Sequence, residues 1–93
     1  MAAPLFSLGQ LVATPGTLAL LADAHTNPAE LLARHQSGDW GDVLPEDTRE
    51  NELSVLQGFR ILSSYPVGED GEKVWIITEA DRSSTCLLLP GEY

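Results

Sequence analysis

Apolar and polar positions alternate through the last third of the chain in the manner of β-strands. Two partly β-branched runs, residues 73–79 and 85–89, flank a short polar connection, and an alternating run at 59–65 precedes them across the glycine-bounded turn 68–71. Successive side chains of a strand point to opposite faces, and short polar connections join the strands of hairpins. The pattern therefore predicts three consecutive strands, at 59–65, 73–79 and 85–89.

Before residue 59 the pattern changes to that of short helices, after one more apolar stretch at 8–13 that predicts a strand. A proline that suits the first turn of a helix stands in three places, at Thr14-Pro15, Asn27-Pro28 and Leu44-Pro45. Threonine and asparagine are also favoured N-caps, and glycines at 38 and 58 suit left-handed C-caps. We therefore predict helices at 15–24, 28–36 and 45–57.

The apolar residues of each predicted helix indicate which side faces the core. For the first two helices the expected inward residues are Leu18, Leu21 and Ala22, then Leu31, Leu32 and His35. The third helix has its apolar residues, Leu53, Val55 and Leu56, only in its second half. We expect these to form its inward stripe, while the polar first half projects into solvent.

Taken together, these elements predict a single α+β domain over residues 1–93. Their order is β-α-α-α-β-β-β, with a mostly antiparallel sheet of three to four strands and short helices packed on one face. Both faces of the strand at 73–79 are partly apolar, and one helical layer covers only one of them. We expect the second face to be covered from within the chain, with a homodimer as the alternative. The residues expected to supply this cover are Leu5, Phe6, Leu8 and Leu11.

The charge balance narrows the classes of partner. The 93 residues include 14 acidic and five basic side chains, for a formal net charge of −9. Single-domain nucleic-acid binders are usually basic, so direct nucleic-acid binding is disfavoured and a basic protein partner is favoured. No stretch is long and apolar enough to predict a membrane span. Cys86, the lone cysteine, is expected to be a buried thiol, which suits a cytoplasmic protein.

A tryptophan loop supplies the first candidate site. His35, Asp39 and Asp42 could together ligate a divalent ion, or serve a small enzyme, although their spacing matches no established metal motif. The favoured interpretation is structural: Trp40 plugs the core, and the two aspartates cap the loop or the next helix.

Two further groups of charged residues could bind a partner. Residues 39–52 hold six acidic side chains against Arg49 alone, so they form either a solvated helix face or a docking surface for a basic protein. Arg82, in the connection 79–84, could anchor an anion or stabilise a turn with Glu79 and Asp81. The candidate contact residues are Trp40, Asp42, Glu46, Asp47, Glu50 and Arg82.

Established catalytic and phosphate-binding motifs are absent from the sequence, so no catalytic residue, resident metal or cofactor is predicted. Several segments do resemble a family of short uncharacterised bacterial proteins encoded on plasmids and integrated mobile elements. They are residues 8–10, 13–16, 38–42, 50–52, 58–63 and 75–83, including Gly38-Asp39-Trp40-Gly41-Asp42. The resemblance implies a bacterial cytoplasm and a mobile-element context, and it carries no residue roles.

These observations favour a non-enzymatic accessory protein of a mobile genetic element that acts by binding a basic protein through its acidic surface. A sharper version is an inhibitor of a host defence nuclease, of the anti-restriction or anti-CRISPR type. The alternative from a different class is the small enzyme or metal-binding protein with its site near His35, Asp39 and Asp42.

Overall fold

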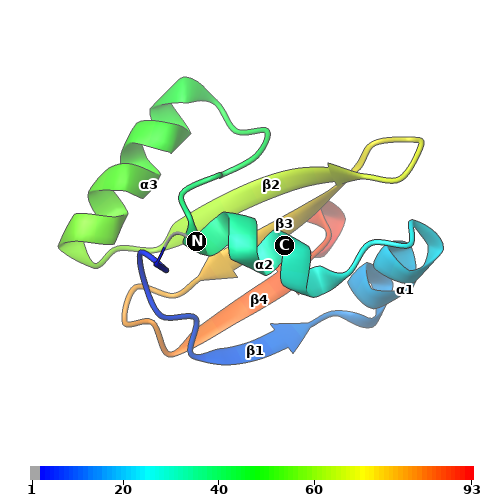
Figure 1. Ribbon diagram of the computed structural model, residues 1–93, viewed down its shortest axis with the longest axis horizontal. Coiled ribbons are helices and arrows are strands. Elements are labelled where there is room, and N and C mark those ends of the chain that lie inside the picture. Colours follow the sequence, from blue (N-terminus) through cyan, green and yellow to red (C-terminus); the bar gives the residue numbers. More distant parts are fainter. Residues whose placement is uncertain (1–2) are drawn as a thin grey trace.

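Four strands form one mixed sheet in the order β1-β4-β3-β2 in the computed structural model, which describes residues 3–93 (Figure 1). The strands are β1 (Gln10–Ala13), β2 (Ile61–Val67), β3 (Glu72–Thr78) and β4 (Ser84–Leu88). The helices are α1 (Pro15–Asp23), α2 (Pro28–Gln36) and α3 (Pro45–Gln57), followed by a C-terminal 3-10 turn, η1 (Pro90–Glu92). Strands β2, β3 and β4 are antiparallel, whereas β1 pairs with β4 in parallel. The predicted order and the mostly antiparallel sheet are confirmed.

The predicted helix caps are also confirmed, because they depend on residues close together in the chain. The Asn27 side chain accepts a hydrogen bond from Ala29 N at 2.9 Å, and the Thr14 hydroxyl accepts one from Thr17 N at 3.2 Å. Gly38 and Gly58 adopt φ angles of +90° and +78°, which favour glycine. Each helix therefore begins and ends within a residue of its predicted bounds.

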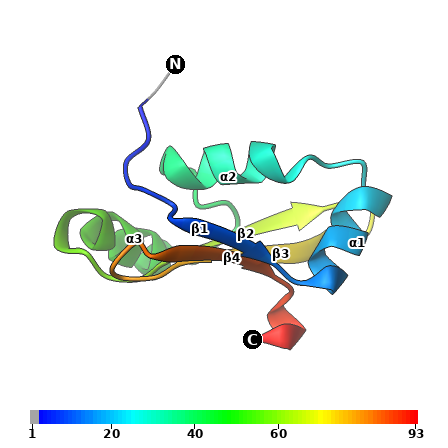
Figure 2. The ribbon, with the colours of Figure 1, turned by 90° about the horizontal axis from the view of Figure 1, so that it is seen from below.

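The core lies between helices α1 and α2 and the face of the sheet that they cover (Figure 2). Leu21 of α1 and Leu31 of α2 pack onto the inward side chains of β2, β3 and β4, which are Tyr65, Val67, Val74, Ile76 and Leu87. Two expectations are wrong: Leu18 is 50% exposed and Ala22 is also exposed, whereas Thr17 is fully buried. Thr17 can take an inward position because its hydroxyl accepts a hydrogen bond from Thr14.

The outer edge of β2 is closed along its length. The Asn51 side chain of α3 bonds both the N–H and the C=O of Leu62, at 3.1 and 2.7 Å. Two residues further on, Ser64 N donates to Trp40 O, and Ser64 O accepts from Asp42 N. The next outward position is Pro66, which has no N–H to offer. Every outward N–H position of β2 is therefore paired or lacks a donor, which prevents another strand from adding here.

The N-terminal segment lies on the helical side of the sheet, contrary to the expectation that it covers the other face. Leu5 N donates to Gln36 O at 2.8 Å, and the Gln36 amide donates to Phe6 O at 2.9 Å. Gly9, with φ of +65°, turns the chain into β1 so close to β4 that a Cβ would lie within 3.0 Å of the Ser83 carbonyl. The segment thus joins the α2 layer before β1 begins.

Within residues 3–93, the other face of the sheet carries no layer of α-helices. Its cover comes from η1 and from the Tyr93 ring, which packs edge-on against Trp75 at 5.7 Å between ring centres. Cys86 lies on this face and is half-buried, so the expectation of a core thiol is wrong. Partial burial raises the pKa of this thiol all the same. No helix in residues 3–93 is long and apolar enough to cross a membrane.

The closure of β2 can be tested at Asn51. We expect Asn51→Ala to lower the free energy of unfolding by about 1–3 kcal/mol, since it leaves the outward N–H and C=O of Leu62 unpaired. Urea denaturation followed by circular dichroism measures this change. Glu50→Ala, at the exposed neighbouring position, is the matched control and should shift stability by less than about 0.5 kcal/mol. Equal stabilities for the two variants would contradict the role assigned to Asn51.

Candidate functional site

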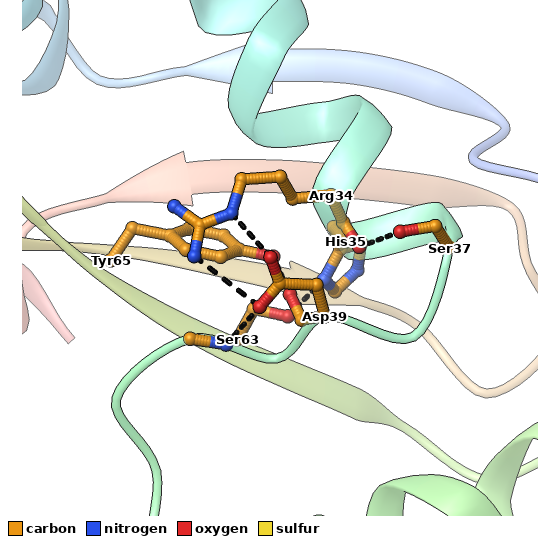
Figure 3. A network of polar contacts seen from close by, with 7 residues as sticks. Arg34, His35, Ser37, Asp39, Ser63 and Tyr65 are labelled. Carbon is orange, nitrogen blue, oxygen red and sulfur yellow. Dashed lines mark hydrogen bonds and ion pairs between the residues drawn. The ribbon is translucent and has the colours of Figure 1, made fainter.

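A chain of buried polar side chains, centred on His35, joins α2 to three strands. His35 Nδ1 lies 2.5 Å from the Ser63 hydroxyl of β2, and His35 Nε2 lies 2.9 Å from the Thr78 hydroxyl of β3 (Figure 3 shows His35 beside Ser63). The Thr78 hydroxyl bonds in turn to the Thr85 hydroxyl of β4 at 2.8 Å, and Thr85 donates to Leu8 O at 2.7 Å. All four side chains are fully buried.

Aromatic rings seal this histidine from solvent. The ring of Phe6 lies 5.1 Å and that of Trp40 lies 6.0 Å from the imidazole, both edge-on. Burial, together with the nearby Arg82 guanidinium, lowers the pKa of His35 to about 4, so the ring is neutral at pH 7. A serine within hydrogen-bond reach of a histidine is the arrangement of a nucleophile and its base, but neither Ser63 nor His35 is accessible to a substrate. The cluster is therefore structural.

An ion pair holds the loop that follows α2. Arg34 Nε donates to Asp39 Oδ2 at 2.6 Å, and the guanidinium lies 4.5 Å above the Tyr65 ring centre (Figure 3). The Tyr65 hydroxyl donates to the backbone carbonyl of Asp39 at 2.6 Å, and Gly41 N donates to Asp39 Oδ1. The Arg34 hydrogen bond lowers the pKa of Asp39, while burial raises that of Tyr65 to about 12. These contacts fix the Trp40 loop on β2.

The predicted metal-ligating residues have other partners. His35 uses both ring nitrogens inside the core, Asp39 binds Arg34, and Asp42 forms an ion pair with Lys73. Across residues 3–93, no group of three or more histidine, cysteine or acidic side chains is placed to hold a metal ion. The three candidates are therefore not brought together as a ligand set.

The predicted contact residues divide into an inner and an outer group. Trp40 is 4% exposed and belongs to the core, as the structural interpretation of this loop predicts. Arg82 is tied to the backbone, since its guanidinium donates to Ser54 O at 2.8 Å and to Phe59 O at 2.6 Å at the end of α3. In contrast, Glu46 and Glu50 are exposed on α3, with Asp47 half-buried beside them. The outer group therefore offers the larger exposed surface to a partner.

Helix α3 presents Leu53 and Leu56 to solvent and leaves Val55 half-buried, so the expectation that these three residues form an inward stripe is wrong. Asn51 and Ser54 are buried, each 4% exposed, whereas Leu53 and Leu56 are 50% and 82% exposed. The reason is that α3 packs beside the edge of β2, where backbone groups require polar partners such as Asn51. The leucines consequently lie on the far side of the helix, next to Glu46, Glu50 and Glu52.

A shallow groove of about 380 Å³ runs along this helix. Its floor is Trp40, and one wall comes from α3 with Glu52, Val55 and Leu56. Leu5, Ser37 and Gly38 form the opposite wall. Trp40 is among the predicted contact residues and Glu52 belongs to the predicted acidic run at 39–52, whereas Leu56 was expected to face inward. A second pattern in the sequence indicates the side that is actually buried. The polar residues at 47, 51 and 54 also recur at helical spacing and so share one side of the helix.

A second hollow, of about 540 Å³, lies at the other end of the sheet. Acidic side chains, Asp23, Glu69, Asp70 and Glu72, line it together with His25. Leu20, Ala24 and Val67 also line it, and it lies away from the predicted contact residues. Comparison with protein-family models, curated proteins and solved structures finds no match to this chain. No residue role is therefore transferred to either hollow from a relative.

The burial of His35 predicts a pH-dependent stability. The folded state holds the pKa near 4, below the ordinary value of 6.5, so the unfolded chain takes up the proton first as the pH falls. The contribution of neutral His35 to the free energy of unfolding is therefore complete above pH 6.5. It is lost between pH 6.5 and 4, by up to about 1.4 kcal/mol per pH unit. The lowered pKa of Asp39 acts in a separate range, below 3.8.

Two measurements test this linkage. Urea unfolding should show a lower free energy of unfolding at about pH 5 than at about pH 7. A proton NMR titration of the His35 ring should give a midpoint near 4 in the folded protein. A midpoint near 6.5, with stability unchanged between the two pH values, would show that the ring is hydrated rather than sealed.

Proposed function

We propose that the protein is a non-enzymatic binding protein whose α3 and adjoining groove take a basic, amphipathic segment of a protein partner. The observation that carries the proposal is the pair of exposed leucines, Leu53 and Leu56, on a helix whose polar side faces the protein. In a helix that only closed a sheet edge, the outward side would ordinarily be polar.

The apolar part of the surface supplies the affinity. Burying a leucine side chain contributes about 1.5–3 kcal/mol, and Leu53 and Leu56 both have surface left to bury. Below them Trp40 gives the groove a rigid floor, because the Arg34–Asp39 pair and Tyr65 hold its loop. A preformed floor reduces the ordering cost of binding.

The acidic part of the surface selects the charge of the partner. Near the leucines on α3, Glu46, Glu50 and Glu52 outnumber the one basic residue, Arg49, within a chain of net charge −9. Such a field attracts lysine and arginine side chains and repels acidic ones, so it acts mainly on specificity and association rate. A partner that fits both features has apolar anchors with basic residues around them.

The candidate catalytic side chains already have partners within the protein, which supports a binding role over catalysis. His35 is sealed in the core, Asp39 is paired with Arg34, and Asp42 is paired with Lys73. The resemblance to mobile-element proteins supports a bacterial cytoplasmic setting for this binding. The exposed leucines favour a partner surface with apolar side chains over the DNA channel of a defence nuclease, which is lined for phosphates.

Synthetic amphipathic helices provide a direct probe. We expect a lysine/leucine peptide to bind, with NMR shifts at residues 53–56 and at the Trp40 indole, and with affinity that falls as salt increases. A glutamate/leucine peptide of the same length should not bind. Shifts that avoid α3, or equal binding of both peptides, would contradict the proposal.

Substitutions separate the two parts of the surface. Leu56→Ser should weaken binding of the lysine/leucine peptide about tenfold, or about 1.4 kcal/mol. Leu18→Ser, at an exposed leucine on α1, is the matched control and should bind as the wild type does. Reversing the charges of Glu46, Asp47 and Glu50 to lysine should weaken binding of the lysine/leucine peptide, and its affinity should no longer fall as salt increases. Unchanged binding after this reversal would show that the acidic face takes no part.

A further inference from the structure

Strand β1 leaves one edge of the sheet open. Gln10 N donates to Ser83 O at 2.9 Å and Thr14 N donates to Leu87 O at 3.0 Å, so these alternate residues face β4. In a parallel pair every second residue faces the neighbouring strand, so the N–H and C=O groups of Leu11 and Ala13 point away from β4. Among residues 3–93 no other strand pairs with this side of β1, and Figure 1 shows no element beyond it.

The two edges of the sheet differ in the residues that protect them. The β2 edge is closed by Asn51, by the Trp40–Asp42 segment and by Pro66. The β1 edge has neither a proline nor a charged side chain, and Leu11 and Val12 are 50% and 44% exposed. Proteins usually protect such edges against pairing with another chain. An apolar edge left open beside a closed one therefore indicates a strand partner.

The short uncharged strand β1 suits pairing with a second copy of this chain. Two molecules of net charge −9 repel each other, so close contact is easiest where few carboxylates lie. One carboxylate does lie at the end of β1, that of Glu92, which is held by the Thr14 hydroxyl and by Leu89 N. Residues 1–22 carry no charged side chain, and β1 is the strand within them. We propose that two copies pair antiparallel through β1 about a two-fold axis at Val12, which joins their sheets into one.

The outward groups of β1 suit this symmetric register. Leu11 of each copy lies opposite Ala13 of the other, and each such pair exchanges two hydrogen bonds, or four in all. The large Leu11 side chain then sits beside the small Ala13 on the helical face. The two Val12 side chains meet on the other face, where each already neighbours Cys86 in the β1–β4 register. Both exposed apolar residues of the edge become covered.

The limits of the edge set the strength of the dimer. Gly9 turns the chain before β1, and Pro15 starts α1 directly after it, so pairing is confined to about four residues per copy. An interface of this length buries less than the roughly 1,200 Å² of standard stable complexes. The dimer is therefore weak and depends on concentration, with monomer at low micromolar protein.

Sedimentation velocity of the full chain tests the pairing. From about 1 µM to about 1 mM the wild type should shift from monomer to dimer. Leu11→Lys adds a charge at the edge, and Ala13→Pro removes an outward N–H without breaking the β1–β4 ladder, as Pro66 does on β2. Both variants should remain monomeric. Leu18→Lys is the matched control, with the same charge change at an equally exposed leucine, and should dimerise.

The outcomes separate the edge from other contacts. A wild type that is monomeric up to about 1 mM overturns the proposal, and so does a Leu11→Lys variant that dimerises like Leu18→Lys. In NMR spectra of the wild type, the amides of Leu11 and Ala13 should shift with concentration while those of Gln10 and Val12 move less. Concentration-dependent shifts confined to Trp75 and Tyr93 would place the contact on the uncovered sheet face instead and would also overturn it.

Discussion

A buried imidazole needs a partner at each ring nitrogen, because an unpaired polar group in a core costs about 1–3 kcal/mol. His35 meets this requirement with Ser63 and Thr78, and the chain continues through Thr85 to the carbonyl of Leu8. One connected set of hydrogen bonds thereby fixes α2, three strands and the N-terminal segment relative to one another. Such a network specifies a single arrangement more strongly than apolar contacts of the same size would.

The exposed surface of α3 follows from this arrangement. Once α2 is fixed on the sheet, the Arg34–Asp39 pair and Tyr65 place the next loop against Ser64, and Trp40 fills the space beside His35. The chain then enters α3 alongside β2, whose outward groups require a polar helix face. The leucines are consequently left on the solvent side, where they and the neighbouring glutamates form the proposed binding surface.

Features that depend on local chemistry could be predicted from the sequence, and features that depend on distant partners could not. The caps at Asn27 and Gly58, and the hairpin from β3 to β4, are each specified within a few residues. The orientation of α3, with its leucines toward solvent, depends on Leu62, eleven positions after Asn51. The side of the sheet on which the N-terminal segment lies depends on His35 and Trp40. Of the predicted contact residues, Glu46 and Glu50 are at the surface, whereas Trp40 and Arg82 serve the interior.

This fold closes one sheet edge with α3 and the Trp40 loop and leaves the other edge free. Amide hydrogen exchange measured by NMR at low protein concentration tests it most directly. We expect the outward amides of Leu62 and Ser64 to be protected like those of the core, because Asn51 and Trp40 accept from them. The outward amides of Leu11 and Ala13 should exchange rapidly. Rapid exchange at Leu62 and Ser64, equal to that at Leu11 and Ala13, would contradict the claim.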